Sequence, residues 1–321
     1  MLIAQAPLRV SLLGGGSDLP AYLVNNDGAV LSFAIDRKVF IVGHPFTHRT
    51  GIALKYSKFE DVQTPTQLVH PIAREVLTRY QVTDIDIAVM SDVPAGTGLG
   101  SSSSFTVAFL AFVRSLCGIE STSVDLAREA CDIEIETLRE PIGYQDQWAS
   151  ALGGINTLHF AHGEVEVESL VLSHVQISTL ENNLRLIPVG KPRSASALLS
   201  RQAQSISLGS HVEKQTGALV ELVKAGKEAL QGEVDQLGPL LDTAWAIKRS
   251  MTDGITSIEI DQMYQRGLSS GSTGGKLLGA GGSGYLAFYV PQTAHQAFDQ
   301  AFPTRLDFKI SQNGAGVIHE S

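Results

Sequence analysis

Three glycines at alternate positions, followed by four serines, constrain this chain most. They are Gly96, Gly98 and Gly100 in the run 94–104, and a long apolar stretch, residues 105–113, comes directly after the serines. Glycine adopts backbone conformations that other residues avoid and lets N–H groups approach a ligand closely. A serine beside an apolar run is a signal for the N-cap of a helix. Because a helix N-terminus presents free N–H donors and a partial positive charge, the segment predicts an anion site that suits phosphate.

A flexible linker is the alternative interpretation of such a Gly/Ser run. The flanks oppose it, because residues 84–90 mostly alternate polar and apolar side chains, as a half-buried strand does, and residues 105–113 are apolar enough for a buried helix. A strand, a glycine turn and a helix N-terminus commonly build a phosphate loop in this order. The loop is not of the Walker type, since the chain contains no G-x-x-x-x-G-K-[ST] sequence.

Composition narrows the class of protein. The chain has 321 residues, 43% of them hydrophobic, which is enough for a large core and for two domains. A formal net charge of -9 argues against a nucleic-acid partner, which needs clustered Lys and Arg. The two cysteines, Cys117 and Cys131, fall in expected helices and fit a reducing cytoplasm rather than a disulfide framework. The sequence has neither a signal peptide nor a run of about 20 apolar residues, so we expect a soluble cytoplasmic protein without a membrane partner.

Strand and helix signals alternate without regular βαβ repetition, which favours an α+β fold in both halves. A boundary near residues 160–180 divides the chain into an N-terminal domain, 1–170, and a C-terminal domain, 171–321. Strands are expected at 8–13, 29–35, 39–42, 84–90, 153–160, 164–168, 184–189, 284–290 and 305–310, with 29–35 and 39–42 forming a pair. Helices are expected at 72–80, after the serines, from a capping box at Thr122 to about 138, and at 195–206, 211–230, 234–251, 260–268 and 293–301.

A second glycine cluster contains G-x-G-x-x-G at Gly279, Gly281 and Gly284. A dinucleotide fingerprint needs a strand before it and a helix after it. Here we expect a helix and a loop before it and a strand after it, so an NAD site is disfavoured. What remains is a glycine-lined loop that approaches a ligand or another backbone, or a tight helix-to-strand turn.

Two carboxylates and one arginine complete the set of candidate residues. Glu134 stands between two isoleucines and Asp146 follows a Pro/Gly turn. Mg²⁺ prefers one or two carboxylates together with hydroxyl and phosphate oxygens, and a hydroxyl that attacks phosphate benefits from a nearby carboxylate. Arg9 can grip phosphate or stabilise a carboxylate, and Asp18, after three glycines, is a plausible acceptor for sugar hydroxyls. Taken singly, the two carboxylates could be surface charges and Asp18 a turn residue.

The order of these segments resembles one family, the GHMP kinases (galactokinase, homoserine kinase, mevalonate kinase and phosphomevalonate kinase). Residues 7–18 resemble the first family motif, 94–104 the second and 279–284 the third, and the resemblance runs along essentially the full chain. Within the family, D-glycero-D-manno-heptose 7-phosphate kinases are the most similar, on the segments 14–20, 70–75, 141–147 and 193–196. Galactokinases usually have Gly-Glu-His where this chain has three glycines, at 14–16, which weakens galactose as the substrate.

The resemblance implies a two-domain fold, with an N-terminal domain similar to ribosomal protein S5 domain 2, a ferredoxin-like C-terminal domain and the active site between them. It also implies a kinase that uses ATP and Mg²⁺ to phosphorylate the anomeric hydroxyl of D-glycero-D-manno-heptose 7-phosphate, giving heptose 1,7-bisphosphate and ADP. Two alternatives stay open. One is a GHMP kinase for fucose, galactose, an amino sugar or an octose phosphate, and the other is a catalytically silent sugar sensor. The oligomeric state also stays open, a homodimer included.

Residue roles follow from the resemblance position by position. Asp146 would be the catalytic base with Arg9 beside it, and Ser102 and Glu134 would hold Mg²⁺. The ATP phosphates would be bound along the second motif, by Pro94, Gly96, Thr97, Gly98, Leu99, Gly100, Ser101, Ser102 and Ser103, although Ser103 and Ser104 also suit helix packing. The sugar phosphate would contact Asp18, Gly15, Gly16, Ser17, Gly281 and Gly282. Apart from the resemblance, a sugar that already carries phosphate needs a cationic pocket, for which Lys191 and Arg193 are the candidates, with Arg37 and Lys38 behind them, unless these four are ordinary surface charges.

Overall fold

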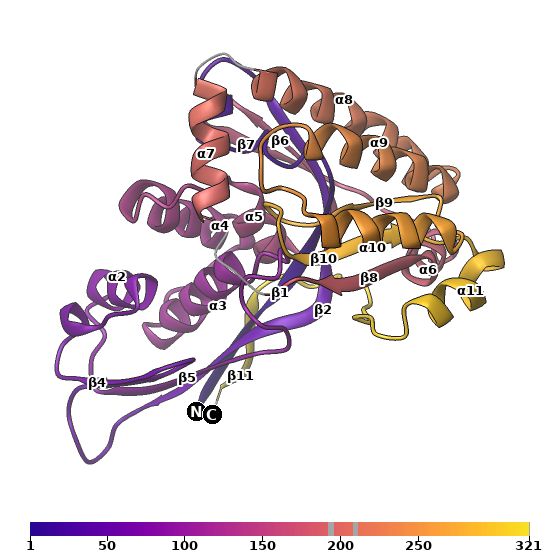
Figure 1. The fold of residues 1–321 in the computed structure, drawn as a ribbon. Helices are drawn as coiled ribbons and strands as arrows, with labels where there is room; N and C mark the ends of the chain where they lie inside the picture. The colour runs from indigo at the N-terminus through magenta and orange to yellow at the C-terminus, as the bar shows by residue number, and fades with distance from the viewer. Residues whose placement is uncertain (192–195, 208–210, 321) are drawn as a thin grey trace.

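The computed structural model describes residues 1–191, 196–207 and 211–320. It has an α+β fold, as expected, with one eight-stranded sheet, one three-stranded sheet and helices packed around them (Figure 1). Two long strands, β1 (Leu2–Leu13) and β2 (Gly28–Pro45), run through the centre of the molecule. Their inward side chains supply much of the core, since every residue from position 6 to position 13 of β1 is buried.

The large sheet is built around β2. Its main path has the order β11-β1-β2-β5-β3-β4, and β6 pairs with the first half of β2 and carries β7 at its other edge. The remaining strands of this sheet are β3 (Ile52–Lys55), β4 (Phe59–Val62), β5 (Ile85–Ser91), β6 (Ile155–Ala161), β7 (Glu164–Ser169) and β11 (Gly316–Glu320).

The expectation of two separate strands at 29–35 and 39–42 was wrong. Both belong to β2, and the register against β1 shifts between Pro7 and Leu8, opposite the polar residues 36 and 37. A bulge of this kind admits extra residues into one strand while the pairing continues on both sides. The polar interruption in the sequence therefore marks a bend and not a turn.

Helices of the first half lie against the large sheet. The helix α3 (Ser101–Leu116) packs on β1 and β2. A π-helical turn, η2 (Asp132–Thr137), continues α4 (Ser123–Cys131), so the single helix expected up to residue 138 changes its geometry midway. The predicted capping box at Thr122 is confirmed, and so is the helix expected at 72–80, which runs from Pro71 to Arg79. Cys131 ends α4, whereas Cys117 lies just beyond α3 and not inside a helix. These helices are α1 (Pro20–Leu23), the short η1 (Pro65–Gln67), α2 (Pro71–Arg79), α3 (Ser101–Leu116), α4 (Ser123–Cys131), the π turn η2 (Asp132–Thr137) and α5 (Gln145–Leu152).

The second half forms the three-stranded sheet, with the order β8-β10-β9. The sequence missed β9, because its residues Gly-Gly-Lys-Leu lack the β-branched and aromatic side chains that signal a strand. The strands are β8 (Leu184–Val189), β9 (Gly274–Leu277) and β10 (Gly284–Tyr289). The helices are α6 (His174–Asn183), α7 (Ser196–Ser207), α8 (His211–Gln231), η3 (Val234–Gln236), α9 (Leu237–Arg249), α10 (Ile258–Ser269), η4 (Gln292–Ala294) and α11 (His295–Ala301).

The segment 305–310 is not the strand that its alternating pattern predicted. It makes two isolated bridges instead, from Leu306 to Leu186 in the small sheet and from Ile310 to Ile35 in the large one. Because the segment crosses from one sheet to the other, it cannot form a ladder with either. The domain division at residue 170 stays a prediction, and the chain returns to the first sheet at its end, where β11 pairs with β1.

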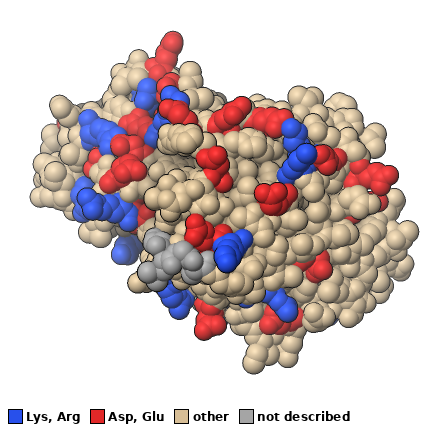
Figure 2. Space-filling view, turned by 90° about the horizontal axis from the view of Figure 1, so that it is seen from above, with Lys and Arg blue, Asp and Glu red and all other residues tan. Residues whose placement is uncertain are grey.

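Charges of both signs intermingle on the molecular face in Figure 2. Over the described residues of that face, Lys and Arg form no continuous patch, in agreement with the net charge of -9. Among the described residues, no helix is long and apolar enough to cross a membrane.

Candidate active site

The second glycine motif ends where α3 begins. Gly100 is the N-cap of this helix, with a left-handed φ of 74°, so the expected serine N-cap was wrong. Left-handed backbone favours glycine, and a glycine N-cap brings no side chain to bond the free N–H groups of the first turn. Those N–H groups, on residues 101–103, are therefore left for an anion, together with the positive end of the helix dipole.

The four serines differ in their surroundings. Ser104 is buried, and its hydroxyl lies within hydrogen-bond distance of the Pro7 carbonyl (2.9 Å) and of the Gly100 carbonyl (3.1 Å). Ser103 is also buried and hydrogen-bonds to Glu134. Ser102 is exposed and lines the cavity described below. Of the four hydroxyls, that of Ser102 is the most open to a ligand.

The second and third glycine motifs touch backbone to backbone. A Cβ atom on Gly279 would lie 2.4 Å from Gly98 Cα, and one on Gly284 would lie 2.5 Å from the Thr97 carbonyl oxygen. The third motif is preceded by the strand β9 and not by the expected helix and loop, but β10 follows it, so the helix of a dinucleotide fingerprint is still missing. The glycines thus allow one loop to pack directly on the other.

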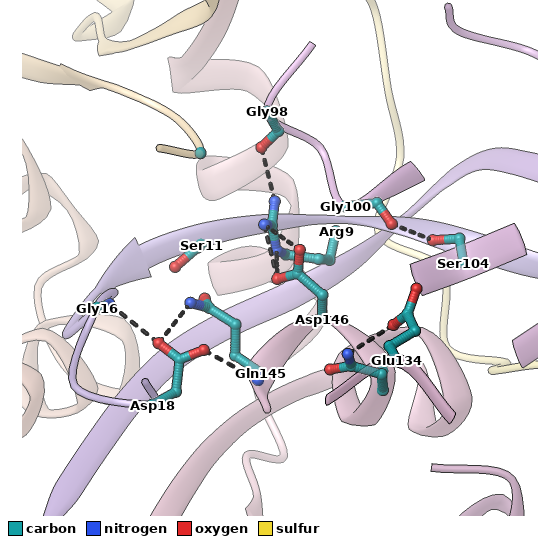
Figure 3. Close-up of polar contacts among 12 residues, drawn as sticks. Arg9, Ser11, Gly16, Asp18, Gly98, Gly100, Ser104, Glu134, Gln145 and Asp146 are labelled. Atoms are coloured by element: carbon teal, nitrogen blue, oxygen red, sulfur yellow. Dashed lines mark hydrogen bonds and ion pairs between the residues drawn. The ribbon is translucent and has the colours of Figure 1, made fainter. Parts of the chain in front are cut away.

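Arg9 and Asp146 form the central ion pair of the site (Figure 3). Arg9 Nε donates to Asp146 Oδ1 (2.8 Å) and Arg9 Nη2 donates to Oδ2 (2.8 Å), while Nη1 donates to the Gly98 carbonyl (2.7 Å). Arg9 is only 4% exposed, whereas a quarter of the Asp146 side chain is exposed. This bidentate arrangement fixes the carboxylate next to the phosphate loop.

Glu134 is a buried carboxylate beside the first turn of α3. It lies on the π-helical turn, and π-helical turns are frequent at functional sites. Its Oε1 accepts from the Thr106 hydroxyl (2.8 Å) and its Oε2 from Gln147 Nε2 (2.6 Å). Burial, and to a smaller extent the nearby Asp146, raise the pKa of Glu134 to about 7 against the lowering effect of its hydrogen bonds. A bound cation would stabilise the ionised form of such a group.

Asp18 is held by the residue that precedes Asp146. Its Oδ1 accepts from Gln145 Nε2 (2.9 Å) and from the Gly16 backbone N–H (3.0 Å), and its Oδ2 accepts from the Gln145 backbone N–H (3.1 Å). Asp18 is only 2% exposed, and burial raises its pKa. The motif 14–18 and the start of α5 are therefore joined through one carboxylate.

Two lysines that the sequence did not single out lie in the site, the buried Lys276 and the half-buried Lys248. Lys276, on β9, donates to the carbonyls of Ser11 (3.2 Å) and Leu12 (2.7 Å) on β1, and so links the two sheets. Lys248, on α9, donates to the carbonyls of Leu277 (3.2 Å) and Gly279. Burial, and then the charge of Arg9, lower the pKa of Lys248 to about 8.

These groups surround a cavity of about 480 Å³. Among the residues singled out from the sequence, its wall contains Arg9, Gly15, Gly16, Asp18, Gly96, Gly98, Gly100, Ser101, Ser102, Ser103, Glu134, Asp146 and Gly279. The others that the structure describes lie outside this wall: Ser17, Arg37, Lys38, Pro94, Thr97, Leu99, Ser104, Lys191, Gly281, Gly282 and Gly284.

Several of the residues outside the wall have structural contacts. Thr97 donates its hydroxyl to the Pro94 carbonyl (3.1 Å), and the Ser17 hydroxyl is bonded to the Gly14 carbonyl (2.8 Å). Lys191 is exposed, and Arg193 lies outside the described residues. A larger groove of about 980 Å³, between α6 and residues 305–309, contains none of the described candidates in its wall.

Sequence reasoning missed part of the wall, notably Ser11, His70, Gln145, Gln202, Lys248 and Lys276. Gln145 could have been found from its position next to Asp146. Lys276 could have been found as a lysine directly before a glycine loop. Nothing in the sequence near Lys248 indicates that its side chain reaches the third glycine motif, 31 residues away.

Comparison with known proteins shows what the chain is similar to. Residues 67–154, which include the phosphate loop, Glu134 and Asp146, match the family described as the GHMP kinases N terminal domain. The chain contains a GHMP kinase N-terminal domain. Along most of its length it is 24% identical to the D-glycero-alpha-D-manno-heptose 7-phosphate kinase of Campylobacter jejuni, over 90% of this chain and 89% of that protein. It is 26% identical to the galactokinase of Thermotoga petrophila, over 87% of each chain.

The fold of this chain is also similar to that of a solved structure. A D-glycero-D-manno-heptose 1-phosphate kinase from Bacteriodes thetaiotaomicron superposes with a TM-score of 0.81, covering 100% of both chains at 21% sequence identity. The expected GHMP kinase fold is thereby confirmed.

Proposed function

We propose that this protein transfers the γ-phosphoryl group of ATP to the anomeric hydroxyl of a sugar phosphate. The observation that carries the proposal is the Arg9–Asp146 pair, which lies against the carbonyl of Gly98 in the phosphate loop and faces the same cavity as Glu134. Phosphoryl transfer needs positioning and charge neutralisation more than covalent chemistry. A fixed carboxylate, a helix N-terminus and the cations Arg9 and Lys248 around one cavity supply both.

The triphosphate would bind at the first turn of α3. Its anionic charge is complemented there by the free N–H groups of residues 101–103, by the helix dipole and by the Lys248 ammonium. Glu134 and Ser102 would hold Mg²⁺, because Mg²⁺ takes one or two carboxylates together with hydroxyl and phosphate oxygens. The ion would neutralise charge that develops on the phosphate oxygens. The buried Glu134 carboxylate, with its raised pKa, fits a cation partner.

Asp146 would accept or orient the proton of the attacking hydroxyl. Arg9 donates to both carboxylate oxygens of Asp146, so the position of the carboxylate is fixed. An anomeric hydroxyl is more acidic than an ordinary alcohol, and a modest base is therefore sufficient.

The substrate that we propose is D-glycero-D-manno-heptose 7-phosphate, with heptose 1,7-bisphosphate and ADP as products. The name of the Campylobacter jejuni relative supports a heptose phosphate, although at 24% identity other sugars of the superfamily stay alternatives: fucose, galactose, an amino sugar or an octose phosphate. A silent sugar sensor also stays an alternative. A cytoplasmic location and a homodimer remain predictions.

ADP release tests the proposal across a panel of sugars: heptose 7-phosphate, heptose 1-phosphate, unphosphorylated heptose, fucose, galactose, an amino sugar and an octose phosphate. We expect the highest kcat/KM with heptose 7-phosphate and a requirement for Mg²⁺. Turnover of another sugar would reassign the substrate, and no turnover across the panel would overturn the kinase function in favour of a sensor.

Arg193 is our proposed contact for the phosphate of the sugar. The Arg193→Ala variant should raise the KM for heptose 7-phosphate about 10-fold, because one charge-assisted hydrogen bond is worth ~1.5 kcal/mol or more. The KM for unphosphorylated heptose should not change. An equal rise in KM for both sugars would remove Arg193 from the phosphate pocket. Lys38→Ala is the matched control, because the Lys38 ammonium donates a hydrogen bond to Gln5 and lies away from the cavity.

A further inference from the structure

Two buried polar atoms in the cavity wall have no hydrogen-bond partner. They are Ser11 Oγ, on β1, and Gln145 Oε1, at the start of α5. Ser11 is only 5% exposed. Buried polar atoms are nearly always paired. Because these two, unlike the other unpaired atoms among the described residues, line the cavity, they point to a polar group that the protein itself does not supply.

Both side chains lie beside Gly15. A Cβ atom on Gly15 would lie 3.3 Å from Ser11 Oγ, closer than an ordinary contact, and 3.7 Å from Gln145 Nε2. Because Gly15 has no side chain, none fills the position next to the hydroxyl and the amide, in the same cavity wall as Arg9 and Asp146 (Figure 3).

Asp18 fixes the direction of the Gln145 amide. The Asp18 carboxylate accepts from Gln145 Nε2 (2.9 Å) and from two backbone N–H groups, of Gly16 (3.0 Å) and Gln145 (3.1 Å). Both Asp18 oxygens already accept from backbone N–H groups, and Gln145 turns its NH₂ group, the donor end of the amide, towards Oδ1. Gln145 Oε1 is consequently left as an acceptor in the cavity wall.

The spacing matches a hydroxylated ring. Arg9 and Ser11 are two residues apart on β1, so their side chains leave the same face of the strand about 6.6 Å apart. Gln145 directly precedes Asp146 on the other wall. A sugar ring whose reacting hydroxyl meets Asp146 would bring a second ring hydroxyl between Ser11 and Gln145.

We propose that Ser11 and Gln145 together recognise a ring hydroxyl of the acceptor sugar, separate from the hydroxyl that is phosphorylated, and that Asp18 is the positioning residue for Gln145. This inference rests on the proposed kinase function. A hydroxyl satisfies both atoms at once, since it donates to Gln145 Oε1 and accepts from the Ser11 hydroxyl. A sugar that lacks this hydroxyl would leave both atoms buried and unpaired, which makes the pair a determinant of specificity.

Ser11→Ala is the decisive variant, and Ser32→Ala is its matched control. Ser32 is also buried on the same pair of strands, with an unpartnered Oγ, but it lies outside the cavity wall. Removing a hydroxyl that has no protein partner should not lower stability, so both variants should keep the wild-type Tm. We expect Ser11→Ala to raise the Kd of heptose 7-phosphate, measured by calorimetry without ATP, about 3- to 10-fold. The Kd of ATP should not change, and Ser32→Ala should alter neither constant.

Deoxy analogues of the sugar identify the hydroxyl. With one monodeoxy heptose 7-phosphate, wild type and Ser11→Ala should bind equally, because the partner of Ser11 is already absent. The inference is overturned if Ser11→Ala binds the parent sugar as tightly as wild type, or if its loss is the same with every analogue. These outcomes differ from failure of the kinase function, in which the wild-type protein neither phosphorylates nor binds any sugar of the panel. If the panel selects another sugar, that sugar and its deoxy analogues replace the heptose in these measurements.

Discussion

Replacing Gly279 with alanine tests whether the two glycine loops must touch. The new Cβ atom would lie 2.4 Å from Gly98 Cα and 3.2 Å from the Gly98 carbonyl oxygen, and both are backbone atoms that a rotamer change cannot move. Gly279 also has a left-handed φ of +69°, which costs an alanine ~1–2 kcal/mol. Forcing an extra carbon into a packed contact costs ~1–3 kcal/mol more. We therefore expect Gly279→Ala to lower the free energy of unfolding by about 2–5 kcal/mol, a large share of the ~5–15 kcal/mol that holds a typical domain.

Gly118→Ala separates the two contributions. Gly118 has nearly the same φ, +70°, but no atom lies within 4 Å of its would-be Cβ. This control should lose only the ~1–2 kcal/mol of backbone strain. Both variants are compared with wild type by urea unfolding followed by circular dichroism.

The function of the two variants should differ as well. Moving Gly98 disturbs the carbonyl that accepts from Arg9 Nη1 (2.7 Å), so Gly279→Ala should raise the KM for ATP and lower kcat, whereas Gly118→Ala should alter neither. If both variants lose the same stability and keep wild-type kinetics, the contact between the loops has no energetic role and the reasoning is refuted.

The other predictions concern the two carboxylates. Asp146→Asn should lower kcat by ~10²–10⁴ in the ADP-release assay while circular dichroism stays native, and a near-normal kcat would leave Asp146 a structural residue. Glu134→Gln, measured in EDTA, should stabilise the free protein at pH 8 by at most about 3 kcal/mol, because the pKa of Glu134 is raised in the fold from 4.5 to about 7. The penalty of the ionised group is complete above about pH 7 and absent below pH 4.5, so the gain in the free energy of unfolding, measured in urea, should disappear as the pH falls. Glu134→Gln should also lose Mg²⁺-dependent turnover. A stability difference between variant and wild type that does not vary with pH would show that the raised pKa of Glu134 is not its cause.

The sequence predicted those parts of the site that depend on residues close together in the chain. Gly98 and Gly100 adopt the left-handed conformations that their glycine motif implied. The residues that escaped prediction depend on contacts between distant segments. Ser11 is one of several serines on strands, and only the folded structure shows that its hydroxyl is buried without a partner. Lys248 lies on an ordinary helix, and its role becomes visible only where its side chain meets Gly279.

Two predictions of secondary structure failed for a related reason. The pattern of residues 305–310 is that of a strand, but Leu306 and Ile310 pair with different sheets, and no local signal encodes this. The bulge in β2 was misread as a turn, because polar residues at a bulge and at a turn look alike until the partner strand is known.

The pairing of β11 with β1 has a consequence for how the molecule reaches its native state. The two ends of the described chain lie side by side (Figure 1), and Leu2 is the neighbour of Glu320 in the ladder. During synthesis β1 can pair early with β2, but the edge at residues 2–5 waits for a strand that leaves the ribosome some 300 residues later. Until then the strand that carries Arg9 and Ser11 has an open edge, which is a template for pairing with another chain. Chains truncated before residue 316 would therefore be expected to self-associate. The strand β11 thus prevents misassembly at the edge of β1 as well as completing the sheet.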